Sequence, residues 1–276
     1  MELPARLVGE WRDEAAWLEA LPELVVECAE LWGLTLEPPV DAPHSLVVPA
    51  GDVVLKLNAP WHSEADHEAD ALALWNGRGA VKLVARDDER RAFLCERCRP
   101  GAPLSSAGVD EVAIVCELLS DLPHVARAAH PFRSLAHEAE RWSEEVAARF
   151  ASAGRPFERA LLEAALDVYR TVDASADALV NQDLHGDNVL RAERLPWLVI
   201  DPKALVGERE LDGVGLLRNA DSEASVRRWL DALSELGLDR QRLRGWGVAH
   251  ALAWGWDEQD GWSEWSVESA SLILGA

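Results

Sequence analysis

The hydrophobic pattern of the chain changes near residue 100. Before that point, short runs rich in β-branched and apolar residues predict strands at 45–48, 53–57, 81–84 and 92–95, after an amphipathic helix at 10–32. Beyond it, apolar residues recur at i, i+3 and i+4, which predicts helices at 110–119, 134–151, 156–172, 222–236 and 241–255. We therefore expect an α+β protein, with a small sheet-bearing lobe at residues 1–97 and a larger, mainly helical lobe at 98–276.

Two short apolar strands, expected at 178–180 and 197–200, interrupt the helical half. Asp183 follows the first, Asn188 comes five residues later, and Asp201 directly follows the second. Phosphoryl transfer in kinases uses a carboxylate that takes a hydroxyl proton, then an amide and a second carboxylate that bind Mg²⁺. A D-x4-N spacing alone also fits a helix cap or a turn, because the chain has 49 acidic residues. The aspartate that follows a buried strand favours the kinase interpretation.

Lys56 lies within an apolar strand, where it shares a face with Val54. A lysine in such a strand costs free energy unless it is paired. Glu64 and Glu68 lie on one stripe of the next predicted helix, so an ion pair of Lys56 with Glu68 would satisfy both groups. Kinases position the phosphates of ATP with such a pair. Two alternatives remain open: Glu64 is the partner, or Lys56 extends its ammonium group to solvent.

The segment Glu96–Cys98 ends the last strand of the first half and runs into the turn at 99–101. An extended connector of this kind offers backbone N–H and C=O groups to an adenine edge, and we place the base at Glu96 to Cys98. The sequence has no G-x-x-x-x-G-K-[ST] motif, so a P-loop is excluded. The C-x-x-C pair at Cys95 and Cys98 has no second pair at zinc-ligand spacing, which disfavours a zinc site.

Composition narrows the choice of partners. The net charge of −22 disfavours nucleic acid, because backbone phosphates would be repelled. The same charge would attract a cationic small molecule, although an acidic surface also serves solubility alone. No run approaches the ~20 apolar residues of a membrane span, and the first residues lack the apolar core of a signal peptide. We expect a cytoplasmic protein with no membrane or nucleic-acid partner.

Several motifs together resemble the aminoglycoside phosphotransferases, in particular the branch of streptomycin 6-kinases and hydroxyurea phosphotransferases. The motifs occur in the same order as in that branch and span residues from about Val53 to Asn219. The resemblance is carried by VLKL at 54–57, HEADAL at 67–72, CERCRPG at 95–101, DLH and NVL at 183–190, IDPK at 200–203, VG at 206–207 with Asp212, and LLRN at 216–219.

This resemblance implies a protein-kinase-like bilobal fold, with ATP and Mg²⁺ as cofactors and a small-molecule hydroxyl as acceptor. By the same resemblance, Asp183 is the catalytic base, while Asn188 and Asp201 are the metal ligands. Lys56 and Glu68 form the pair that positions the phosphates. Lys203 is similar to a lysine usual in the branch, where it either steadies phosphate oxygens or pairs with Asp212.

The chain departs from the family pattern at several positions. Asn181 replaces a histidine that braces the catalytic loop; it can supply a hydrogen bond but not the same ring packing. Asp187 replaces a glycine and adds negative charge, and Glu208 stands where the branch carries aspartate. The phosphate-covering hairpin at 42–52 is expected to be short, with no glycine before its turn. These changes leave a catalytically weak, pseudokinase-like binding protein as an alternative.

The C-terminal region combines tryptophans with acidic residues and is the expected acceptor surface. Such a surface suits a cationic, sugar-like molecule through ion pairs and ring contacts. The alternative, which is commoner for tryptophans in helices, is that Trp246, Trp254 and Trp265 pack in the core and the acidic residues form a solvated face. A streptomycin-type aminoglycoside is the favoured acceptor, with a sugar or amino-sugar of ordinary metabolism as the alternative. The residues concerned are Trp246, His250, Trp254, Trp256, Asp257, Glu258, Asp260, Trp262, Glu264 and Trp265.

Overall fold

The computed structural model describes residues 1–125 and 129–276. Contacts divide them into two compact units: unit 1 is Met1–Ala102 with Leu190–Asp201, and unit 2 is Pro103–Val189 with Pro202–Ala276. The sequence placed residues 190–201 with the helical half. Backbone hydrogen bonds tie this segment to unit 1, since the Val81 N–H donates to the Val199 carbonyl at 3.0 Å and the Gly101 N–H to that of Arg191 at 3.0 Å.

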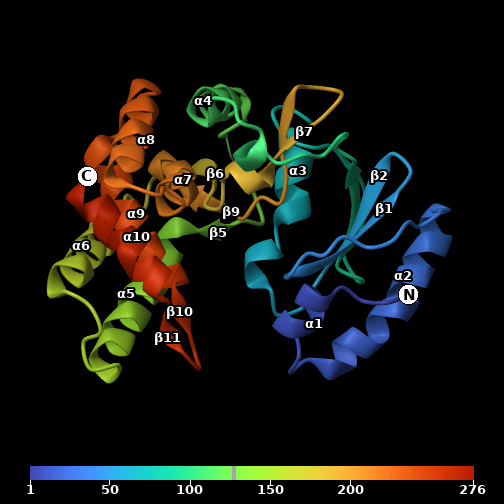
Figure 1. The fold of residues 1–276 in the computed structure, drawn as a ribbon, viewed down its shortest axis with the longest axis horizontal. Helices are drawn as coiled ribbons and strands as arrows, with labels where there is room; N and C mark the ends of the chain where they lie inside the picture. Colours follow the sequence, from blue (N-terminus) through green and yellow to red (C-terminus); the bar gives the residue numbers. More distant parts are fainter. Residues whose placement is uncertain (126–128) are drawn as a thin grey trace. The chain divides into compact units, whose positions relative to one another are not determined.

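Unit 1 is built on an antiparallel sheet in the order β1-β2-β4-β3 (Figure 1). Its strands are β1 (Ser45–Ala50), β2 (Val53–Asn58), β4 (Ala92–Glu96) and β3 (Leu83–Asp87), and a second ribbon pairs β7 (Val189–Arg191) with β8 (Trp197–Val199). Leu55 and Leu57 of β2 pack with buried residues of α1 (Ala5–Glu10) and α2 (Ala15–Trp32). Because side chains alternate along a strand, Lys56 points to the opposite face, toward α3 (Glu68–Trp75).

The helix predicted at 10–32 begins later, at Ala15, and a separate short helix that the sequence did not predict, α1, ends at Glu10. Trp11 lies in the break between them, where its ring packs edge-on against Trp17 with centroids 6.0 Å apart. Its indole N–H donates to the carbonyl of His44 at 3.3 Å. These tertiary contacts favour a turn over a continuous helix.

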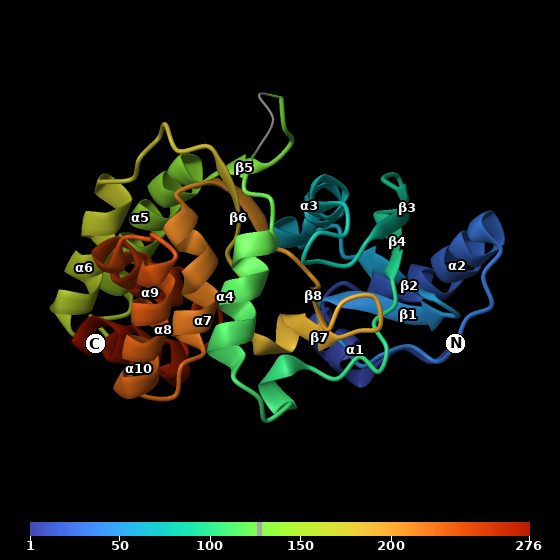
Figure 2. The same cartoon turned by 90° about the horizontal axis from the view of Figure 1, so that it is seen from above.

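Unit 2 is mainly helical, with α9 packed against α5, α6, α7, α8 and α10 (Figure 2). The helices are α4 (Glu111–Asp121), α5 (Leu135–Ser152), α6 (Arg159–Arg170), α7 (Val214–Arg218), α8 (Glu223–Glu235), α9 (Arg240–Trp254) and α10 (Glu264–Gly275). A small sheet has the order β5-β9-β6, and β10 (Trp256–Asp257) pairs with β11 (Gly261–Trp262). The strands of the sheet are β5 (Arg133–Ser134), β9 (Ala204–Gly207) and β6 (Ala178–Asn181).

Side-chain caps define the starts of four helices in unit 2. Asp110, Ser222, Asp239 and Ser263 each accept a hydrogen bond from a backbone N–H three residues later, and so begin α4, α8, α9 and α10. The α+β class predicted from the sequence is confirmed. Within residues 1–125 and 129–276, none of the helices has the length and apolar character needed to cross a membrane.

Candidate active site

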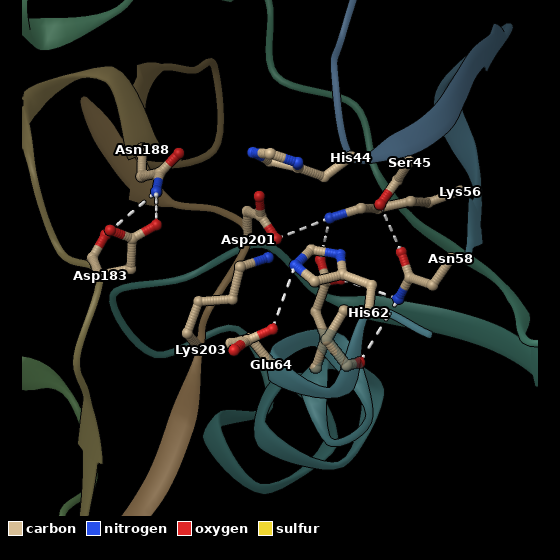
Figure 3. A network of polar contacts seen from close by, with 12 residues as sticks. His44, Ser45, Lys56, Asn58, His62, Glu64, Asp183, Asn188, Asp201 and Lys203 are labelled. Atoms are coloured by element: carbon tan, nitrogen blue, oxygen red, sulfur yellow. Dashed lines mark hydrogen bonds and ion pairs between the residues drawn. The ribbon is translucent and has the colours of Figure 1, made fainter. Parts of the chain in front are cut away.

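Lys56 is held between two carboxylates in unit 1 (Figure 3). Its Nζ atom lies 2.7 Å from Oε1 of Glu68 on α3 and 2.7 Å from Oδ1 of Asp201, which follows β8. Glu68 is almost fully buried, with 2% of its surface exposed. The Lys56–Glu68 ion pair predicted from the sequence is therefore confirmed. Glu64 has a different neighbour, with Oε2 at 3.8 Å from Nε2 of His62.

Burial by itself would lower the pKa of Lys56. The charges of Asp201 and Glu68, with the hydrogen bonds that they accept, outweigh burial and raise the pKa of Lys56 above its ordinary value. The ammonium group therefore stays charged. A charged, fixed ammonium group in a mostly buried site is suited to binding a phosphate oxygen.

Asn58 is a member of this site that the sequence did not predict. Its Nδ2 donates to Oε2 of Glu68 at 3.2 Å, while its Oδ1 accepts from Oγ of Ser45 at 2.7 Å (Figure 3). Asn58 lies two residues after Lys56 and therefore on the same face of β2. The sequence did carry a signal for Asn58: it is a polar residue in an apolar strand, two positions from Lys56.

Asp201 adopts a left-handed backbone conformation with φ of 49°. Non-glycine residues are uncommon in this region, and they concentrate at functional sites, where the surrounding structure holds them in place. The conformation turns the chain directly after β8 and aims the carboxylate at Lys56.

The connector carries Glu96 and Cys98, the residues predicted to lie at the adenine. Oε2 of Glu96 accepts from Nη2 of Arg194 at 2.8 Å, and the Glu96 N–H donates to the Lys82 carbonyl at 2.8 Å. Burial would raise the pKa of Glu96, but the hydrogen bonds from Arg194 and Lys82 bring it below the ordinary value. Burial, followed by the Glu96 charge, raises the pKa of Cys98 to about 12, so Cys98 is a neutral thiol.

Asp183 and Asn188 lie together in unit 2. Nδ2 of Asn188 is 3.0 Å from the Asp183 carbonyl oxygen and 3.4 Å from Asp183 Oδ2 (Figure 3). A 3-10 turn at Gly186–Asn188 folds the loop back, and Gly186 is tightly enclosed there, since an added Cβ would lie 2.4 Å from Oε1 of Glu111. Because the Asn188 nitrogen faces Asp183, its Oδ1 is the atom suited to a cation.

Asn181 braces this loop, as the sequence suggested. Its Oδ1 accepts from the Asp183 N–H at 3.2 Å and from the Lys203 N–H at 2.9 Å. Asp187 is oriented by a hydrogen bond that its Oδ1 accepts from Oγ of Ser105. Asn181 therefore supplies hydrogen bonds to the loop at the position where the family pattern has a histidine.

Asp212 supports the loop from behind. Its Oδ1 accepts from the Asn181 N–H at 2.7 Å, and its Oδ2 lies 3.3 Å from Nδ1 of His124. Burial raises the pKa of Asp212 to about 6, although the neighbouring His124 acts in the opposite direction.

This shift predicts a pH dependence of stability. Between the ordinary pKa of 3.8 and about 6, folded Asp212 keeps a proton that the unfolded chain has lost, so the free energy of unfolding should fall as pH rises through this window. In Asp212→Asn the group no longer titrates, and its Oδ1 can still accept from Asn181. Urea unfolding of both proteins at several pH values from 4 to 6 should show that wild type loses about 2 kcal/mol relative to the variant. Parallel pH profiles would contradict this assignment.

Arg218 is the second residue that sequence reasoning missed. It ends α7, is 8% exposed, and places Nη2 2.6 Å from Oδ1 of Asp183. The sequence offered Arg218 only as part of a family motif. No local pattern connects it to Asp183, 35 positions away.

The tryptophans of the C-terminal region have different environments. Trp246 is fully buried and donates through Nε1 to Oε2 of Glu208 at 2.8 Å, so it is a core residue. Trp265 is 51% exposed, and Trp256 packs edge-on against Trp262 with centroids 4.7 Å apart. Glu258, in the turn between β10 and β11, pairs with Arg149.

Comparison with solved structures places the fold among protein-kinase-like phosphotransferases. The choline kinase LicA from Streptococcus pneumoniae matches 92% of this chain and 98% of its own, with a TM-score of 0.66 at 12% identity. A thermostable mutant of an aminoglycoside phosphotransferase, in a ternary complex with ADP and hygromycin B, matches 90% of this chain and 96% of its own, with a TM-score of 0.60 at 12% identity.

Sequence comparison identifies the family. Residues 39–261 match the model of the aminoglycoside/hydroxyurea antibiotic resistance kinases, and the chain belongs to this family. A streptomycin 6-kinase of Streptomyces glaucescens is 36% identical, over 93% of this chain and 89% of its own length. A hydroxyurea phosphotransferase of Kitasatospora aureofaciens is 34% identical, over 100% of this chain and 86% of its own. The resemblance seen in the sequence is therefore confirmed, and the chain is a phosphotransferase that acts on hydroxyl groups.

Proposed function

We propose that the protein transfers the γ-phosphate of ATP to a hydroxyl group of a streptomycin-type aminoglycoside. The observation that carries the proposal is the buried Lys56, held 2.7 Å from both Glu68 and Asp201. This is the arrangement by which kinases position nucleotide phosphates. The streptomycin 6-kinases among the relatives support the acceptor, as does the net charge of −22, which attracts a molecule bearing guanidinium groups.

In the proposed reaction, Asp183 takes the proton of the acceptor hydroxyl while the oxygen of that hydroxyl bonds to the γ-phosphorus. The bond from that phosphorus to the bridging oxygen breaks, and ADP leaves with the electron pair. The transition state is loose, so positioning and electrostatic stabilisation supply most of the rate. The amide oxygen of Asn188 and the carboxylate of Asp201 are both of the ligand type that suits a hard cation, since Mg²⁺ takes oxygen ligands from few side chains and from phosphates. We propose that these two residues hold Mg²⁺, which would neutralise charge on the phosphate oxygens.

The remaining predicted residues would bind the nucleotide. We propose that the backbone from Glu96 to Cys98 binds the adenine edge and that Lys203 steadies phosphate oxygens. The Glu96 side chain, held by Arg194, would keep the connector in place rather than touch the base. Neutral Cys98 adds no charge beside an uncharged ring.

The proposal is tested with purified protein, ATP labelled at the γ-phosphate and Mg²⁺. Streptomycin, hydroxyurea and a neutral hexose serve as acceptors in parallel reactions. We expect label on streptomycin, and no label when EDTA is present. Transfer to hydroxyurea alone would support phosphotransferase activity but would refute streptomycin as the acceptor, in favour of the acceptor named for the hydroxyurea phosphotransferase. Label on none of the three acceptors, while ATP still raises the melting temperature, would refute the proposed acceptor class.

A further inference from the structure

Arg218 joins the catalytic loop to helices α7 and α9 of the same unit. Its Nη2 donates to Asp183 Oδ1 at 2.6 Å, and its Nη1 lies 3.2 Å from Nδ1 of His250. The guanidinium carbon lies 4.9 Å from the ring centroid of Trp254, within the range of a cation–π contact. Three neighbours of different chemistry thus hold one side chain.

The protonation of His250 follows from its surroundings. Burial, followed by the Arg218 charge, lowers the pKa of His250 well below its ordinary value, so the ring is neutral. Arginine can only donate, so Nδ1 of His250 is the acceptor and the proton lies on Nε2. Nε2 lies 3.3 Å from Oε1 of Gln182, to which it donates. Because Gln182 is bonded to Asp183, these contacts close a ring through the catalytic loop.

The two carboxylate oxygens of Asp183 have different contacts. Oδ1 accepts the short, charge-assisted bond from Arg218, while Oδ2 has the longer contact of 3.4 Å with Asn188. A carboxylate fixed at one oxygen presents the other in a constant direction. A general base has to be within hydrogen-bond reach of the proton it accepts, so that direction matters for the rate.

We propose that Arg218 is the positioning residue of Asp183: it fixes Oδ1 so that Oδ2 receives the acceptor proton, and His250 and Trp254 hold Arg218 in place. The inference rests on the proposed function, because it assumes that Asp183 is the base. It also explains why arginine occupies the position. A planar guanidinium donates to the carboxylate and the imidazole at once and stacks on the indole, whereas an ammonium group cannot do all three.

The test compares Arg218→Met and Arg218→Lys with a matched control, Arg242→Met. Arg242 also lies in unit 2, pairs with a buried carboxylate (Glu208) and stacks on Trp246 at 5.5 Å, but it has no part in the proposed chemistry. We expect Arg218→Met to lower kcat about 100-fold with KM for ATP within about twofold, because misplacing a catalytic group by about 1 Å has this cost. Arg218→Lys should recover part of the loss, and Arg242→Met should keep kcat at a temperature where all variants are folded.

A double variant separates positioning from general stability. If Arg218 acts through Asp183, adding Arg218→Met to Asp183→Asn should change the residual rate less than about twofold. A multiplied loss in the double variant, or equal kcat values for Arg218→Met and Arg242→Met, would overturn the inference. If wild type transfers no phosphate, the proposed function itself fails. If wild type transfers, Asp183→Asn does not and Arg218→Met does, only the positioning role fails.

Discussion

Replacing Asp183 with asparagine should lower kcat about 100- to 10,000-fold, with little change in KM for ATP, because general-base catalysis contributes that much. Asparagine keeps the size of the side chain, and its Oδ1 can still accept from Arg218. It cannot take a proton from the acceptor hydroxyl. The measurement is a steady-state assay with streptomycin at saturating Mg²⁺, with nucleotide binding followed by the shift in melting temperature.

The control for this prediction is Asp187→Asn, four residues along the same loop. The Asp187 side chain is 70% exposed, and its Oδ1 is occupied by Ser105. We expect this variant to keep kcat within a few fold. Undiminished transfer in Asp183→Asn would refute the assignment of the base, and unchanged turnover in Asp201→Ala would refute the proposed metal ligand.

Replacing Lys56 with methionine should both destabilise the protein and abolish productive nucleotide binding. Methionine has a similar length and packs in the strand, but it leaves the carboxylate of Glu68, 2% exposed, without its cation. Removal of one partner from a buried ion pair costs about 3–5 kcal/mol. Urea unfolding measures the loss of stability, and ATP-dependent turnover at a temperature where the variant is folded measures the loss of function.

Two variants give this prediction its controls. Adding Glu68→Gln to Lys56→Met removes one of the unpaired charges, so we expect it to restore part of the stability but none of the turnover. Glu64→Gln changes the carboxylate that the sequence offered as the alternative partner, 34% exposed and nearest to His62. It should stay within about 0.5 kcal/mol of wild type, as surface substitutions do. A Glu64 variant as damaged as the Lys56 variant would contradict the observed pairing.

Periodicity predicted the long helices α4, α5, α6, α8 and α9, because each has an apolar stripe, and three of them (α4, α8 and α9) begin at a capping side chain. Periodicity missed α10 (Glu264–Gly275), because its tryptophan and acidic residues look like a solvated tail in the sequence. In the structure this helix packs on α9. Periodicity also missed β9 (Ala204–Gly207), because all four residues are buried and show no alternation. A short element that is buried on all sides shows no alternation of apolar and polar residues, so its conformation is set by the elements packed around it.

The sequence alone predicted the family, the α+β class and an ion pair of Lys56 with a glutamate of the next helix, and the structure selected Glu68 over Glu64. These depend on local spacing, since the two partners lie within 12 positions and face one another once strand and helix form. Only the tertiary structure showed that Asp201, 145 positions from Lys56, binds the same ammonium group as Glu68. The contact of Arg218 with Asp183 likewise appears only in the tertiary structure. Contacts between distant segments depend on how helices and strands pack, and no repeat in the sequence encodes that packing.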